Sequence, residues 1–302
     1  MVKNLVLENV SVGFKLPQGV FYAVDDVSLS LPGGNFTAII GESGCGKSVL
    51  GQAILNILPS GVIKKGRVLY NGEQVEKILS AFGIIPQNPS ESLNPVRKIG
   101  KQMQDILAVH NIADSDNSYK KQCLHLFGLQ EADRVLAAYP HELSGGMLQR
   151  VLCAMAVSSK PEWILADEPT KGLDEQVGAV VRKNLLTIKQ DLHLSMLIIT
   201  HDIALAKEVC DDVLVMYAGQ VLEHNADIWH KPLHPYTKGF LKALPKNGLQ
   251  VIPGKAPVPG ESFTGCKFAA RCHYCTTRCK EEKPAMQQVG NAEVRCFLYA
   301  EG

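Results

Sequence analysis

The chain has 302 residues, enough for one large domain or two smaller ones. It carries 31 Lys and Arg against 30 Asp and Glu, and this balanced charge argues against a nonspecific nucleic-acid binder, so no nucleic acid is expected among its partners. Hydrophobic residues make up 46% of the chain, and no apolar run approaches the roughly 18 residues of a membrane span. The N-terminus lacks the apolar core of a signal peptide, so we expect a cytosolic chain.

The first third predicts short strands around one helix. Leu5 and Leu7 alternate with polar neighbours, and strand-forming residues recur over 35–40 and 67–70. Between these last two strands, apolar residues at helical spacing over 49–58 predict a helix.

The middle of the chain changes character, because residues 88–157 are rich in polar helical stretches and hold no convincing strand. Two apolar strands follow at 163–166 and 196–200, with a helical stretch around 175–190 between them. This βαβ pattern predicts a parallel sheet. Residues 212–223 then predict a hairpin.

Residues 41–48, GESGCGKS, fit the phosphate-binding pattern G-x-x-x-x-G-K-[ST] between a predicted strand and a predicted helix. The glycines let backbone N–H groups close on phosphates, Lys47 should reach the β- and γ-phosphates of ATP, and Ser48 should bind Mg²⁺. A chance glycine-rich turn is the alternative, which the flanking strand and helix disfavour. The residues assigned here to ATP and magnesium are Gly41, Ser43, Gly44, Cys45, Gly46, Lys47, Ser48 and Val49.

Charged side chains end both strands of the βαβ unit. Asp167 and Glu168 end the first strand, where Asp167 would hold magnesium and Glu168 would polarise an attacking water. His201 follows the second strand; alone it would read as a capping or core histidine, but carboxyl ends of parallel strands face the ligand crevice.

A glycine pair precedes an apolar helix in the stretch that begins at Leu143. Ser144 is a good N-cap, and the amides of Gly145 and Gly146 would be exposed to an anion. An ordinary capped helix start is the alternative.

Cysteine is concentrated near the C-terminus, where five of the nine cysteines fall within the last 37 residues. A reducing cytosol makes a disulfide framework unfavourable, so the cluster predicts a metal site. Thiolates suit a [4Fe–4S] cluster and tetrahedral Zn²⁺ alike, and ligand softness does not separate the two.

Together these stretches resemble the ATP-binding subunits of ABC transporters. The resemblance implies an α/β fold: a P-loop ABC ATPase core with a RecA-like parallel sheet and an N-terminal antiparallel β subdomain over residues 1–230, a helical subdomain inserted at about 88–157, and a small Cys-rich C-terminal extension at 231–302. The corresponding motifs are the Walker A at 41–48, the Q-loop at Gln87, the signature at 143–149, the Walker B at 163–168, the D-loop at 172–174 and the switch histidine at His201.

The resemblance also implies roles and partners. Glu168, His201 and Gln87 would be catalytic, with Gln87 also contacting the bound ATP. An aromatic residue should stack on adenine, and Phe14 is the candidate with Tyr22 as its competitor. In a head-to-tail dimer with a second, nonidentical ATP-binding subunit, the ATP bound by the partner would be served by Ser144, Gly145, Gly146 and Asp174.

Segments 89–95, 234–238 and 252–272 narrow the resemblance to importers of dipeptides, oligopeptides and nickel. It implies an ATPase that lies peripherally on the cytoplasmic face of the membrane and works with two membrane permease subunits and an extracytoplasmic substrate-binding protein. A peptide cargo is favoured over nickel or a metallophore, and a soluble, non-transport ABC ATPase is the remaining alternative. In several relatives the tail holds a [4Fe–4S] cluster, whose pattern assigns as ligands Cys266, Cys272, Cys279 and Cys296, with Cys275 surplus.

Overall fold

The computed structural model describes residues 3–17, 19–75, 79–173, 175–244, 250–258, 261 and 263–300. The chain divides into two compact units. Among the described residues, the first unit comprises those within 33–36 and 79–209, and the second comprises those within 3–32, 37–75 and 210–300.

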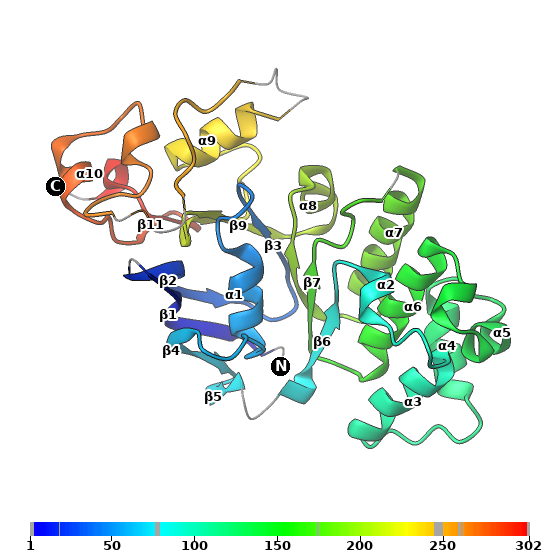
Figure 1. Cartoon of the computed structure of the whole chain (residues 1–302). Helices are drawn as coiled ribbons and strands as arrows, with labels where there is room; N and C mark the ends of the chain where they lie inside the picture. The colour runs from blue at the N-terminus through cyan, green and yellow to red at the C-terminus, as the bar shows by residue number, and fades with distance from the viewer. Residues whose placement is uncertain are drawn as a thin grey trace. The chain divides into compact units, whose positions relative to one another are not determined.

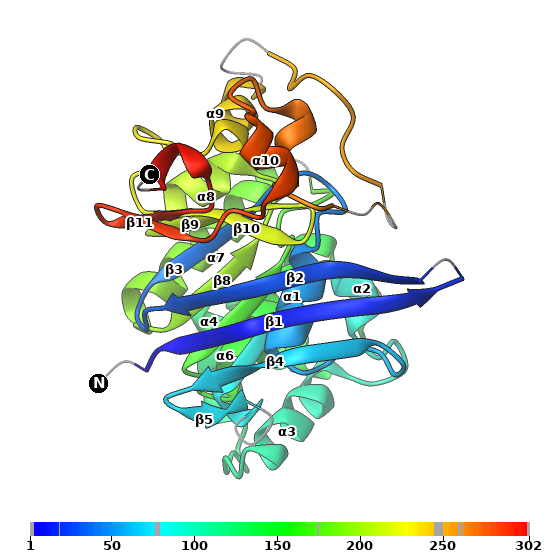
Figure 2. The same cartoon turned by 90° about the vertical axis from the view of Figure 1, so that its left-hand side faces the viewer.

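An antiparallel sheet occupies the N-terminal part of the second unit (Figure 2). Its strands are β1 (Leu5–Leu16), β2 (Gly19–Leu31), β4 (Ile63–Tyr70) and β5 (Glu73–Gln74), in the order β2-β1-β4-β5. The alternating residues at the start of β1 are buried on one face, which confirms the antiparallel β subdomain expected from the sequence.

The second unit contains a further set of paired strands in the order β11-β12-β10-β9-β3. The strands β3 (Phe36–Ile40) and β9 (Asp212–Tyr217) are parallel, and each is buried along its whole length, as apolar strands covered on both faces are. The predicted hairpin is confirmed, because β9 turns directly into antiparallel β10 (Gln220–Asn225). The helix predicted after β3 is α1 (Lys47–Ile54).

The first unit contains the predicted βαβ unit. The strands β7 (Trp163–Asp167) and β8 (Ser195–Ile199) are parallel and are joined by α7 (Glu175–Asp191), and β6 (Phe82–Ile85) pairs in parallel with the other side of β7. The carboxyl ends of all three strands therefore lie at one edge. The helix α8 (Ile203–Val209) follows β8.

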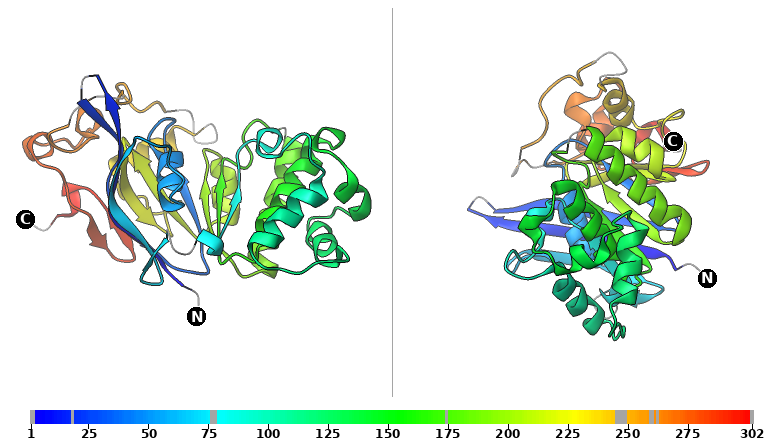
Figure 3. Two further views of the ribbon diagram at one scale, coloured as in Figure 1. Left: turned by 60° about the horizontal axis from the view of Figure 1, so that its bottom comes forward. Right: turned by 90° about the vertical axis from the view of Figure 1, so that its right-hand side faces the viewer.

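Helices make up the described part of residues 88–157, which contains no strand, as the sequence predicted. The most buried of them, α6, contacts its neighbours α2, α3, α4 and α7 (Figure 3). The helices are α2 (Pro89–Ser92), α3 (Ile99–Val109), α4 (Ser118–Leu126), α5 (Ala132–Ala137) and α6 (Gly145–Ser158).

The C-terminal extension packs within the second unit (Figure 1). Its strand β12 pairs with β10, and Phe268 contacts Tyr217 and Tyr236 with ring centroids 5.4 Å apart in each pair. These contacts join the tail to β9. The second compact unit therefore contains both β9 and the tail, and no unit boundary falls at residue 230. Its elements are α9 (Pro235–Lys242), α10 (Thr277–Glu281), β11 (Gln287–Val289) and β12 (Ala292–Val294). Within the described residues, no helix is long and apolar enough to cross a membrane.

Candidate functional site

The glycine-rich loop connects β3 to α1, and its glycines are required by close backbone contacts. A Cβ on Gly41 would stand 2.2 Å from the Met216 carbonyl oxygen, and a Cβ on Gly46, whose φ is +106°, would stand 2.1 Å from that of Ala23. Lys47 is buried, and its Nζ donates to the carbonyl oxygens of Gly41 and Glu42 at 2.9 and 3.0 Å. Contacts within the protein therefore shape the loop, with the lysine inside it.

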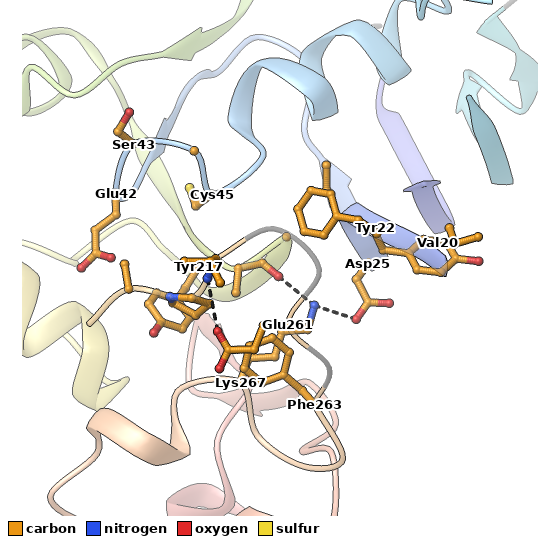
Figure 4. A pocket seen from close by; sticks show the side chains of 18 of the residues that line it. Val20, Tyr22, Asp25, Glu42, Ser43, Cys45, Tyr217, Glu261, Phe263 and Lys267 are labelled. Carbon is orange, nitrogen blue, oxygen red and sulfur yellow. Dashed lines mark hydrogen bonds and ion pairs between the residues drawn. The ribbon is translucent and has the colours of Figure 1, made fainter. Parts of the chain in front are cut away.

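A cavity of about 430 Å³ opens beside this loop (Figure 4). It is within the size range of small-molecule sites. One side comes from β2 and the loop, another from the β9–β10 turn, and a third from the C-terminal extension. The lining residues used below are Tyr22, Asp25, Glu42, Val258, Phe263 and Lys267.

The two aromatic candidates for the adenine lie on the paired strands β1 and β2. Tyr22 lines the cavity beside the loop, whereas Phe14 does not and instead pairs with Phe21 in the β1–β2 ladder. The assignment of the adenine contact to Phe14 stays a prediction, with Tyr22 as its competitor.

In the first unit, the two strand-end residues of the βαβ unit meet. Glu168 Oε2 lies 2.6 Å from His201 Nδ1 and also accepts from the His201 backbone N–H at 3.3 Å. The Glu168 side chain is 11% exposed and that of His201 is 58% exposed. A nearly buried carboxylate is thus held against a histidine that solvent or a ligand can reach.

The remaining predicted residues of the first unit lie at the ends of their elements. Asp167 is the last residue of β7, and Gln87 is exposed just after β6. Ser144 is the N-cap of α6 and accepts from the Met147 N–H at 3.3 Å, as predicted. A Cβ on the next residue, Gly145, would meet no atom within 4 Å, so that helix start is open, and Gly146 follows it. Asp174 lies outside the described residues.

The tail makes contacts with the loop that sequence reasoning missed. Arg271 Nη1 donates to both Glu42 carboxylate oxygens at 3.1 and 3.0 Å, and Tyr236 Oη accepts from the Glu42 N–H at 3.1 Å. Nearby, Lys267 Nζ lies 2.9 Å from Asp25 Oδ2. The two residues of each pair are some 200 positions apart in the sequence, so no spacing pattern could predict these contacts. The sequence feature that could have pointed to them is an arginine, Arg271, next to the cysteine cluster.

The tail cysteines surround a second cavity, of about 180 Å³. Cys266, Cys272, Cys279 and Cys296 all line it, and Cys275 does not. Burial raises the pKa of Cys266 to about 11, and proximity to the other thiols adds to this effect. All nine cysteines fall in the described part of the chain and none forms a disulfide there, and the same residues contain no group of three or more His, Cys, Asp or Glu arranged to hold a metal ion.

The chain is similar to known proteins along nearly its whole length. A family model described as ABC transporter matches residues 24–171, and one described as the C-terminal region of oligopeptide/dipeptide transporters matches residues 222–279. The chain is 34% identical to the oligopeptide transport ATP-binding protein OppD of Haemophilus influenzae over 98% of each chain. It is 35% identical to the dipeptide transport ATP-binding protein DppD of Escherichia coli, over 95% of this chain and 94% of that one.

Among solved structures, the fold is similar to a dimeric ATP-binding cassette, MJ0796, in a post-hydrolysis state bound to ADP and phosphate. The TM-score is 0.62 at 26% identity, covering 73% of this chain and 97% of that chain.

Proposed function

The chain belongs to the ATP-binding subunits of ABC transporters, and from this we propose that it hydrolyses ATP to power the import of peptides across the cytoplasmic membrane. The assignment of peptides as cargo is supported by one observation. Nearly the whole chain, tail included, is similar to ATP-binding proteins of oligopeptide and dipeptide transport. Nickel or metallophore import, and a soluble non-transport ATPase, are not favoured by these relatives.

The chemistry follows from the residues at each strand end. The P-loop amides and Lys47 would bind the phosphates of ATP, and Ser48 and Asp167 would hold Mg²⁺, which neutralises phosphate charge when bound. Glu168 would polarise the attacking water, with His201 Nδ1 at 2.6 Å from its carboxylate, and Gln87 would be the third catalytic residue. The signature residues would serve the ATP bound mainly by the partner subunit: Ser144, Gly145, Gly146 and Asp174.

The proposed partners are a second, nonidentical ATP-binding subunit, two permease subunits and an extracytoplasmic substrate-binding protein, with this chain peripheral on the cytoplasmic face. A groove of about 450 Å³ in the first unit supports the permease contact. It is lined by Pro86, next to Gln87, and by Leu93, Asn94 and Arg97 of the segment that follows. A segment of a permease bound in this groove would contact Pro86, so a movement of the neighbouring Gln87 would be transmitted to it.

The test of this function is uptake of radiolabelled di- and oligopeptides by cells that lack the chain and are complemented with variants. The wild-type chain should restore peptide uptake and co-purify with integral membrane subunits, while Glu168→Gln should associate with them without restoring uptake. Nickel uptake should be the same with and without the chain. Peptide uptake unaffected by loss of the chain would contradict the proposal.

We further propose that the tail holds a [4Fe–4S] cluster, with Zn²⁺ as the alternative. Cys266, Cys272, Cys279 and Cys296 line one cavity, and four thiolates are the donors that such a cluster takes. His234 also lines it, and its buried Nε2 has no hydrogen-bond partner within the described chain, while its Nδ1 accepts from the Tyr236 N–H. An N–H with no partner is an unfavourable feature that a cluster sulfur would remove. The role proposed for the group is to fix the fold of the tail.

Anaerobic purification followed by iron, sulfide and zinc analysis tests this assignment. About four irons per chain are expected, with a broad absorption near 400 nm. Cys279→Ser should lose the iron, while the matched variant Cys275→Ser should keep it. One zinc per chain would identify the alternative, and a metal-free chain would contradict both.

A further inference from the structure

The cavity beside the P-loop has a wall that comes from the C-terminal extension. Tyr22 of β2 stands on one side of it and Phe263 of the extension stands on the other (Figure 4), and Val258 also lines it. A flat purine is a suitable occupant of a space bounded by aromatic rings, because ring faces stack on one another.

An ion pair anchors this wall to β2. Lys267 Nζ lies 2.9 Å from Asp25 Oδ2 and donates to the Ala218 carbonyl oxygen at 2.7 Å, and it stands 5.6 Å from the centre of the Phe263 ring. The lysine is 8% exposed, so this contact is largely withdrawn from water and the geometry of its partners is well defined. The ring of Phe263 is therefore held beside the cavity by a contact to the strand that carries Tyr22.

A second contact reaches the P-loop itself. Arg271 is 7% exposed in its side chain, and its guanidinium is fixed by Nε donating to the Pro253 carbonyl oxygen at 3.0 Å and by Nη1 donating to Glu42. Glu42 is a loop residue, so its carboxylate is a negative charge in the segment that must bind phosphates. Arg271 neutralises that charge.

We infer that the C-terminal extension is part of the nucleotide site: Phe263 forms the outer wall for the base of ATP, and Arg271 acts as a positioning residue that holds the P-loop through Glu42. The inference rests on the proposed ATP binding and is independent of the transported cargo. It makes the affinity for nucleotide depend on residues more than 200 positions beyond the P-loop.

The experiment measures dissociation constants of the full-length chain for ATP and for inorganic tripolyphosphate, which has no base. Phe263→Ala should weaken ATP binding about fivefold and leave tripolyphosphate binding unchanged, since it removes a ring contact only. Arg271→Gln should weaken both ligands about tenfold, since it leaves the Glu42 carboxylate unpaired beside the phosphates. Arg271→Lys should recover part of the loss.

A double-mutant cycle of Arg271 and Glu42 distinguishes the positioning role of Arg271 from a general loss of protein stability. Glu42→Gln added to Arg271→Gln should restore most of the affinity, because the unpaired negative charge is then gone. The matched control is Arg67→Gln, which breaks an exposed ion pair with Glu8 in the same unit.

Equal ATP binding by wild type, Phe263→Ala and Arg271→Gln would overturn the inference and leave the proposed function standing. A double variant as weak as Arg271→Gln would overturn the positioning role. A wild-type chain that binds no ATP would overturn the proposed function together with the inference.

Discussion

At the scale of single residues, Glu168 combines two features of a site residue. Its backbone φ is +48°, a conformation that costs free energy for a residue with a side chain, and its N–H donates to the Ile199 carbonyl oxygen at 2.8 Å. That contact with β8 holds the strained residue in place and brings its carboxylate to His201. Strain retained at a strand end, together with a short contact to histidine, fits a carboxylate that must be aimed at water.

Glu168→Gln tests that role. The amide keeps the size of the side chain but is a poor base, so phosphate release should fall about 10²–10⁴-fold while the dissociation constant for ATP stays near the wild-type value. Phosphate release and nucleotide binding measure the two effects. Glu131→Gln, which breaks only the exposed ion pair with Arg134, should behave as wild type. Full turnover by Glu168→Gln would contradict the assignment.

At the scale of elements, the hairpin β11–β12 is joined to β10 by a charged cluster around His224. His224 Nε2 lies 3.4 Å from Asp212 Oδ1 on β9, and its Nδ1 lies 3.3 Å from Glu293 Oε2 on β12. Burial alone would lower the pKa of His224, but the hydrogen bonds and charges of Asp212 and Glu293 outweigh burial and raise it. The protonated imidazolium therefore links three strands.

This arrangement predicts how stability depends on pH. Because the pKa of His224 in the folded chain lies above its ordinary value of 6.5, its stabilising contribution is complete below that value and is lost as pH rises through the folded pKa. The free energy of unfolding of the wild type should therefore exceed that of His224→Gln by more at acidic pH than at alkaline pH. Denaturant titrations from about pH 5.5 to pH 8.5 measure this difference. A constant difference for His224→Gln would contradict the argument.

At the scale of the whole molecule, the N-terminus of α6 is open, and in the proposed dimer it would face the second ATP-binding subunit. The first N–H groups of a helix have no partner within the helix, and nothing lies within 4 Å of a Cβ placed on Gly145. Such a terminus attracts anions, and the γ-phosphate of an ATP bound by a second subunit is the anion that the family assigns to it. Assembly should therefore depend on ATP.

Light scattering after size exclusion tests this dependence. Glu168→Gln with Mg²⁺ and ATP should elute as a dimer, either of itself or with the second ATP-binding subunit that co-purifies with it, and as a monomer with ADP. Adding Gly145→Asp should abolish the dimer, because a carboxylate at that terminus repels the phosphate. A Glu168→Gln chain that stays monomeric with ATP, alone and with that subunit, would contradict the proposed assembly.

The amino-acid sequence alone was enough to predict those secondary-structure elements and functional motifs that depend on residues close together in the chain. The loop 41–48, the βαβ unit that ends in Glu168 and His201, and the N-cap at Ser144 each depend on residues within a few positions of one another. Helix and strand periodicity and short phosphate-binding patterns are local, so they can be recognised in one sequence without an alignment.

Only the tertiary structure decided which distant residues meet. The cavity beside the P-loop is lined by residues of β2, of the β9–β10 turn and of the tail, which are far apart in the sequence. The pairing of Arg271 with Glu42 spans 229 positions, and the grouping of four cysteines around one cavity depends on how the tail folds on itself. Such contacts arise from packing of the whole unit, and packing leaves no periodic trace in the order of the residues.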